Sequence, residues 1–93
     1  MTVEEIKQKI TPILIRRGIT RASIFGSVAR GEATAESDVD ILVEIPHAHG
    51  LFEFANIKHE LEDMLGKKVD LVEYRAIKAR IRENILSSQI SIL

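Results

Sequence analysis

Residues 21–45 read RASIFGSVARGEATAESDVDILVEI, and this stretch decides the fold. Its first five residues predict a short strand that stops at Gly26. Residues 39–45 are rich in β-branched side chains and predict a longer strand that stops at Pro46. Gly26-Ser27 directly follows the first strand, and Asp38-Val39-Asp40 opens the second. We therefore expect two strands whose connection begins with a glycine–serine turn and ends with two aspartates.

The segments around this stretch predict helices that alternate with strands. Apolar residues at helical spacing follow Thr2, which forms a capping-box pattern with Glu5, and Gly18 is expected to end this helix. Pro12 predicts either a kink or a fresh helical start with Thr11 as its cap. The later segments predict a helix ending at Gly66, a third strand, a last helix, and a tail that is either a fourth short strand or a partner-binding end (51–65, 68–73, 77–86 and 89–93).

This order of elements indicates an α/β or α+β fold with a small mixed sheet of three to four strands flanked by helices. The predicted helix over 51–65 carries a stripe of mainly apolar residues (Leu51, Phe54, Ala55, Lys58, Leu61 and Leu65). A chain of 93 residues is expected to form one domain, residues 1–93. Apolar residues make up 45% of the chain, which is enough for one modest core.

Composition excludes several functional classes. The chain has no cysteine, so disulfides, thiolate metal sites and cysteine nucleophiles are excluded. Thirteen basic against fourteen acidic residues give a net charge of −1, and we therefore expect no direct nucleic-acid binding. The first residues lack the apolar core of a signal peptide, and no apolar run approaches the roughly 20 residues that span a bilayer. The expected location is the cytoplasm, away from membranes.

Three aspartates form the candidate catalytic and metal-binding set. Side chains two residues apart on a strand point to the same face, so Asp38 and Asp40 project together. Asp70 joins them if the third strand lies beside theirs. Carboxylates roughly 5 Å apart repel by about 3 kcal/mol per pair at an effective dielectric constant near 20. Because all-oxygen ligands suit Mg²⁺ or Mn²⁺, a divalent cation would offset this repulsion.

The glycine–serine turn is the candidate phosphate-binding element. Gly26 allows the backbone to approach a ligand closely. Ser27 is a suitable N-cap for a short helical turn, whose N–H groups favour phosphate. Arg30 would add charge near the phosphates or the acceptor. Phosphate donors beside carboxylate-held metal ions indicate phosphoryl or nucleotidyl transfer, with Asp38 and Asp40 on both metals of a two-metal scheme. Asp70 would bind the catalytic metal and accept the proton of the attacking hydroxyl.

The segments 26–32, 37–43 and 68–72 closely resemble the minimal nucleotidyltransferase (MNT) family of the DNA polymerase β-like nucleotidyltransferase superfamily. The family pattern is Gly-Ser, ten residues, Asp-x-Asp and a later acidic residue, and every position is filled here. The likeness covers nearly the whole chain.

This resemblance implies an ATP-using, Mg²⁺-dependent enzyme with two metal ions. It also implies a HEPN-domain toxin as partner, neutralised when AMP is transferred from ATP to a tyrosine of that toxin. Two alternatives stay open: a non-enzymatic antitoxin that blocks its partner by binding, and nucleotidyl transfer to a small molecule or RNA.

The other residue groups have plainer interpretations. His47 and His49 are expected in an exposed loop, because no nearby sequence supplies further metal ligands. Leu51, Phe52 and Phe54 are expected in the core, with one of them left exposed as the alternative. Six basic residues crowd the C-terminal third, either as a solvated helix face, as a docking surface for an acidic partner, or as contacts to the triphosphate (Lys67, Lys68, Arg75, Lys78, Arg80 and Arg82).

Overall fold

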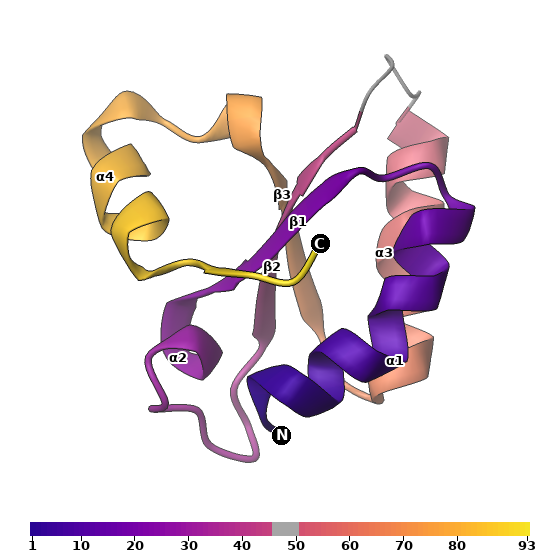
Figure 1. The fold of residues 1–93 in the computed structure, drawn as a ribbon, viewed down its shortest axis with the longest axis horizontal. Helices are drawn as coiled ribbons and strands as arrows, with labels where there is room; N and C mark the ends of the chain where they lie inside the picture. The colour runs from indigo at the N-terminus through magenta and orange to yellow at the C-terminus, as the bar shows by residue number, and fades with distance from the viewer. Residues whose placement is uncertain (46–50) are drawn as a thin grey trace.

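Helices and strands alternate along the chain in the predicted order. The computed structural model describes residues 1–45 and 51–93, so the predicted loop with His47 and His49 lies outside the described residues. The first half contains α1 (Val3–Arg16), β1 (Arg21–Phe25), the short α2 (Gly26–Ala29) and β2 (Val39–Glu44). The second half contains α3 (Leu51–Leu65), β3 (Val69–Glu73), the 3₁₀ helix η1 (Tyr74–Ala76), α4 (Ala79–Ser88) and β4 (Ile90–Ser91) (Figure 1).

One four-stranded mixed sheet carries the fold, in the order β3-β2-β1-β4. β1 pairs antiparallel with both β2 and β4, whereas β2 pairs parallel with β3. A parallel pair needs a long crossover, and α3 supplies it. The expected small mixed sheet is therefore confirmed with four strands. The tail forms the fourth strand, which is the first of the two alternatives predicted for it.

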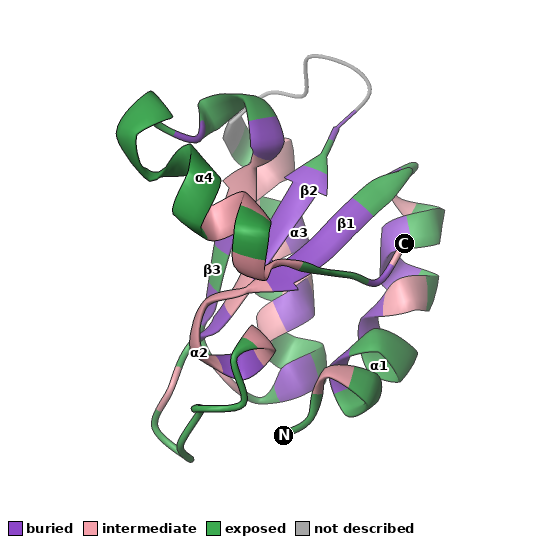
Figure 2. Ribbon diagram, turned by 60° about the vertical axis from the view of Figure 1, so that its left-hand side comes forward, coloured by how far each residue is buried: buried purple, intermediate pink, exposed green. Residues whose placement is uncertain are grey.

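The two faces of the sheet are covered unequally (Figures 1 and 2). α1 and α3 lie side by side on one face, over the main apolar core. Ile41 belongs to this core and is fully buried, while its neighbour Leu42 belongs to a smaller cluster with Tyr74 and Ile77. Because successive strand residues point to opposite faces, the smaller cluster marks the second face, which η1 and α4 cover in part.

The first helix begins and ends as the sequence predicts, but Pro12 does not divide it. The Thr2 hydroxyl accepts a hydrogen bond from the Glu5 backbone N–H at 3.2 Å, as an N-cap should. The Glu5 carboxylate accepts from the Thr2 hydroxyl, which replaces the reciprocal bond of a full capping box. The predicted fresh start at Thr11 is wrong, because one helix continues through Pro12 and the Thr11 hydroxyl donates to the Lys7 carbonyl at 2.6 Å.

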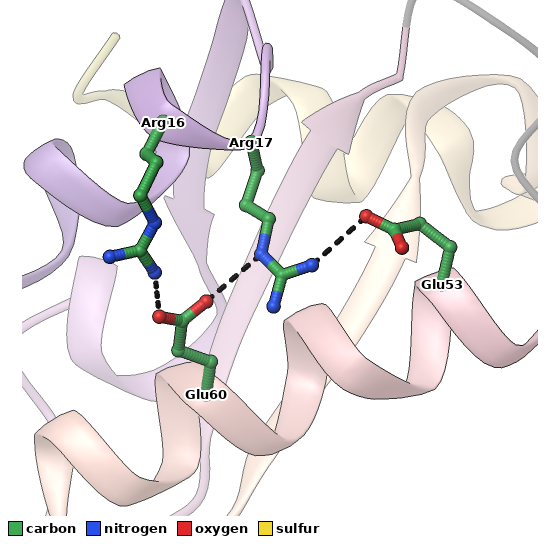
Figure 3. A network of polar contacts seen from close by, with 4 residues as sticks. All are labelled: Arg16, Arg17, Glu53 and Glu60. Carbon is green, nitrogen blue, oxygen red and sulfur yellow. Dashed lines mark hydrogen bonds and ion pairs between the residues drawn. The ribbon is translucent and has the colours of Figure 1, made fainter.

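A network of arginines and glutamates joins the two helices of the main layer (Figure 3). Arg17 donates to Glu53 at 3.0 Å and to Glu60 at 2.9 Å, and Arg16 forms a second ion pair with Glu60. Arg17 is about one quarter exposed, so these pairs lie at the edge of the core. They fix the end of α1 against α3 and leave the opposite face of the sheet unaffected.

Three predictions about the second half need correction. The last helix begins at Ala79, two residues later than predicted, because η1 occupies Tyr74–Ala76 first. The stripe of α3 omitted Ile57, which is fully buried. Phe52 is not a core residue, since it is 86% exposed, whereas Phe54 is partly buried against the core. The Leu51 side chain lies outside the described residues. No helix in the described part of the chain has both the length and the apolar character needed to cross a bilayer.

Candidate active site

Backbone pairing places two of the three candidate aspartates side by side. Asp40 of β2 is the Cα partner of Asp70 of β3 in the parallel register and of Phe25 of β1 in the antiparallel register. Asp38 precedes β2 and lies two residues before Asp40, so it shares the same side of the extended chain. Asp38, Asp40 and Asp70 are called the aspartate row below. The row faces away from the layer of α1 and α3, on the face of the sheet that also carries Leu42. The expected neighbourhood of the third strand is confirmed.

The charges of these aspartates act on one another. The pKa of Asp40 is raised from 3.8 to about 6, because partial burial disfavours its charged form and because the carboxylates of Asp70 and Asp38 repel it. Arg30 opposes this rise. The repulsion expected from the sequence therefore contributes to the raised pKa of Asp40, after burial. A cation placed here would remove it.

Gly26 makes room for the central carboxylate. A Cβ atom added to Gly26 would lie 2.0 Å from Asp40 Oδ2, which is far inside any allowed contact. Gly26 also has a φ of +71°, a conformation that other residues rarely adopt. The sequence predicted a glycine for close approach, and the described group that approaches it is the Asp40 side chain. The glycine–serine turn and the Asp-x-Asp pair are thus one packed unit.

Ser27 and Arg30 differ from their predicted roles in detail. The N-cap of α2 is Phe25, without a side-chain hydrogen bond, so the prediction of Ser27 as N-cap is wrong. Ser27 is the second residue of α2 and half-buried, and its carbonyl accepts a hydrogen bond from the Glu32 N–H at 2.9 Å. Arg30 caps the end of α2 and pairs with Glu32 at 3.3 Å. The helix α2 contacts β1 and β2, and the positive charge of Arg30 acts on Asp40.

A model of the family described as polymerase beta, nucleotidyltransferase matches residues 8–93. The chain belongs to this nucleotidyltransferase family. The enzyme is 45% identical over 93 residues to a candidate protein adenylyltransferase of Methanocaldococcus jannaschii, covering 100% of both chains. It is 38% identical over 90 residues to the protein adenylyltransferase MntA of Thermococcus cleftensis, covering 92% of this chain and 91% of that relative.

Solved structures agree with this nucleotidyltransferase fold. A structure described as a candidate minimal nucleotidyltransferase is 38% identical to this chain and has a TM-score of 0.81. The match covers 97% of this chain and 95% of that chain. The resemblance to the minimal family is therefore confirmed. A complex of a tri-AMPylated HEPN toxin of Shewanella oneidensis with an MNT antitoxin matches at 18% identity and a TM-score of 0.76, covering 97% of this chain and 71% of that chain. At that identity the likeness concerns the fold.

The oxygen atoms of the three candidate aspartates suit a divalent cation, but the three side chains do not converge on one point. Within residues 1–45 and 51–93, no three acidic, histidine or cysteine side chains converge tightly enough to hold a metal ion together. The donor set still fits Mg²⁺, because Asp38, Asp40 and Asp70 offer only carboxylate oxygens. A bound cation would reduce the repulsion that Asp38 and Asp70 exert on Asp40.

Sequence reasoning missed two residues whose hydrogen bonds position the segments that carry the aspartates. The Glu62 carboxylate accepts a hydrogen bond from the Val69 N–H at 3.0 Å and so fixes the first residue of β3, next to Asp70. This bond lowers the pKa of Glu62. On the other side, Ser37 Oγ accepts from the Thr34 N–H at 2.9 Å in the turn that leads to Asp38. A Thr-x-x-Ser spacing before the aspartates was the available signal for that turn, whereas Glu62 gave none.

Proposed function

We propose that this nucleotidyltransferase transfers AMP from ATP to a tyrosine hydroxyl of a HEPN-domain toxin and thereby acts as its antitoxin. Family membership supports the transfer of a nucleotide. The names of the two relatives at 45% and 38% identity support a protein as acceptor. The fold shared with the antitoxin of an AMPylated HEPN toxin supports the partner.

One observation carries the chemistry: Asp40 lies in register with Asp70 on one side and is packed against Gly26 on the other. In the proposed reaction the tyrosine oxygen forms a bond to the α-phosphorus of ATP, and the bond from that phosphorus to the β-phosphate oxygen breaks. Pyrophosphate leaves, and the phenol proton passes to a base. Asp70, exposed on the outer strand β3, is the residue we assign to receive it.

The same residues would hold Mg²⁺. We assign Asp38 and Asp40 to both of two ions, and Asp70 to the ion on the acceptor side. When bound, the ions would lower the pKa of the attacking hydroxyl and stabilise charge on the leaving pyrophosphate. We assign Gly26 and Ser27 of α2, with Arg30 at its end, to the phosphates of ATP, where Arg30 would supply a positive charge.

The test is intact-mass analysis of a HEPN-domain protein from the same organism, after incubation with the enzyme, ATP and Mg²⁺. We expect a gain of one or more AMP groups, lost in Asp38→Asn and Asp40→Asn and kept in the exposed Asp63→Asn control. Equal labelling by the aspartate variants would overturn the assignment. Toxin neutralised without any mass gain would indicate an antitoxin that acts by binding alone. Label on RNA or on a small molecule, with none on the protein, would show a different acceptor.

A further inference from the structure

A groove of about 420 Å³ lies beside Asp70, on the same face of the sheet as the aspartate row. Its floor and wall are mainly apolar and come from the sheet and from residues 74–88, here called the C-terminal arm (Phe25, Val72, Ile77, Ile81 and Ile85). Val72 follows Asp70 by two residues on β3, so both side chains point to this face. The groove therefore leads from an apolar surface directly to the carboxylate.

The rim of the groove carries positive charge. Lys78 and Arg80 line it, and both are exposed. The neighbouring Arg75 pairs with Glu73 at 2.9 Å, and Arg82 donates to a backbone carbonyl. Within residues 1–45 and 51–93, no acidic side chain forms an ion pair with Lys78 or Arg80. Two cationic side chains are thus left to meet a ligand.

We infer that this groove receives the acceptor segment of the protein substrate, and that the segment is a tyrosine flanked by acidic residues. The inference rests on the proposed function and names the part of the partner that the site recognises. A tyrosine has an apolar ring and a hydroxyl tip, which match the apolar floor and the adjoining Asp70. Acidic neighbours match Lys78 and Arg80 by charge.

Other occupants fit less of the groove. A serine or threonine side chain is too short to cover the apolar floor while it reaches Asp70. A triphosphate would use the cations and leave the floor uncovered. An adenine ring would cover the floor and leave the cations unused. An acidic tyrosine segment uses all three features at once.

Binding is measured directly on the full chain with two peptides that share a central tyrosine, one flanked by glutamates and one by lysines. We expect the acidic peptide to bind and to shift the methyl resonances of Ile77, Ile81 and Ile85. The double variant Lys78→Glu/Arg80→Glu should weaken this binding by about tenfold or more. Acidic residues suit the start of α4, so the helix should persist. The matched control Lys7→Glu/Lys9→Glu changes the same charge on α1, on the opposite face, and should bind as wild type does.

Affinity for ATP with Mg²⁺ and AMP transfer to the partner are measured on the same proteins. Unchanged ATP affinity in Lys78→Glu/Arg80→Glu supports the inference. A loss of ATP affinity would overturn it and assign the groove to the nucleotide. Failure of the acidic peptide to bind better than the basic one would also overturn it. Peptide bound in the groove without AMP transfer by wild type would refute the proposed function alone, whereas full transfer by the groove variant would refute the docking site alone.

Discussion

Replacing Asp40 with asparagine should stop AMP transfer and at the same time stabilise the folded protein. The pKa of Asp40 rises from 3.8 to about 6 in the native state, first through burial and then through repulsion by Asp70 and Asp38. A change of about two in pKa corresponds to roughly 3 kcal/mol. Because Asp40 remains partly exposed, solvent screening reduces this to about 1–2 kcal/mol. For a domain of this size, that is a rise in Tm of about 5–10 °C.

The sign of the pH dependence follows from proton binding. The native state binds the Asp40 proton more tightly than the unfolded chain does, so this carboxyl favours the native state most below pH 3.8. That contribution is lost as the pH rises from about 4 through about 6. The amide introduced by Asp40→Asn is neutral throughout, and the stability difference between variant and wild type should therefore widen between about pH 4 and about pH 7. Mg²⁺ should reduce this difference in stability, because a cation held by the carboxylates of the wild-type protein offsets their repulsion.

Thermal unfolding at several pH values, with and without Mg²⁺, checks this. The Asp63→Asn variant on α3 removes one exposed carboxylate away from the row and serves as the control. If Asp40→Asn were no more stable than wild type at about pH 7, or if its advantage were the same at about pH 4, burial and repulsion would not disfavour the charged form of Asp40 as described.

Three further predictions, which use four substitutions, test other parts of the fold. Gly26→Ala places a methyl group against the Asp40 carboxylate at a positive φ, and we expect a loss of about 3 kcal/mol or more in urea unfolding. Gly18→Ala, with a φ of +77° and open space, should cost only about 1 kcal/mol, and equal losses would show that Asp40 moves aside freely. Tyr74→Phe removes both hydrogen bonds of a buried hydroxyl and should lower the free energy of unfolding by about 1–2 kcal/mol; no change would mean that the bonds do not stabilise the arm. Phe52→Ser should change the free energy of unfolding by less than about 0.5 kcal/mol, and a larger loss would show that the ring is covered.

The strands and the aspartate row could be predicted because both depend on local, periodic signals. The β-branched residues of 39–45 and the alternation of 68–73 fixed two strands, and spacing of two residues placed Asp38 and Asp40 on one side. The proximity of Asp70 depended on the third strand lying beside β2. The observed parallel pairing of β2 with β3 places Asp70 opposite Asp40. The sequence could not show which group approaches Gly26, because that contact joins the first residue of α2 to a residue of β2 that is distant in the sequence.

The C-terminal half was less predictable because tertiary contacts override its local pattern. Tyr74 turns into the second cluster and its hydroxyl donates to Gln89 at 2.9 Å, while Arg21 stacks over its ring at 4.0 Å. Tyr74 is also the first residue of η1, which precedes the start of α4 at Ala79. The sequence of residues 74–78 has no helical periodicity from which the contacts of Tyr74 could be predicted. The role of Glu62 was hidden for the same reason, since its partner is a backbone N–H seven residues away.

The helix α4 has no buried residue, although it forms a wall of the groove. Free energies of local opening are low for segments with few buried apolar contacts, so this arm should exchange its amide hydrogens well before α1 and α3 do. The strands β2 and β3, which carry Asp40 and Asp70 and contain buried residues, should exchange slowly. Early exchange in α4 with slow exchange in β2 and β3 would show that the wall beside Asp70 opens while the strands of Asp40 and Asp70 stay paired.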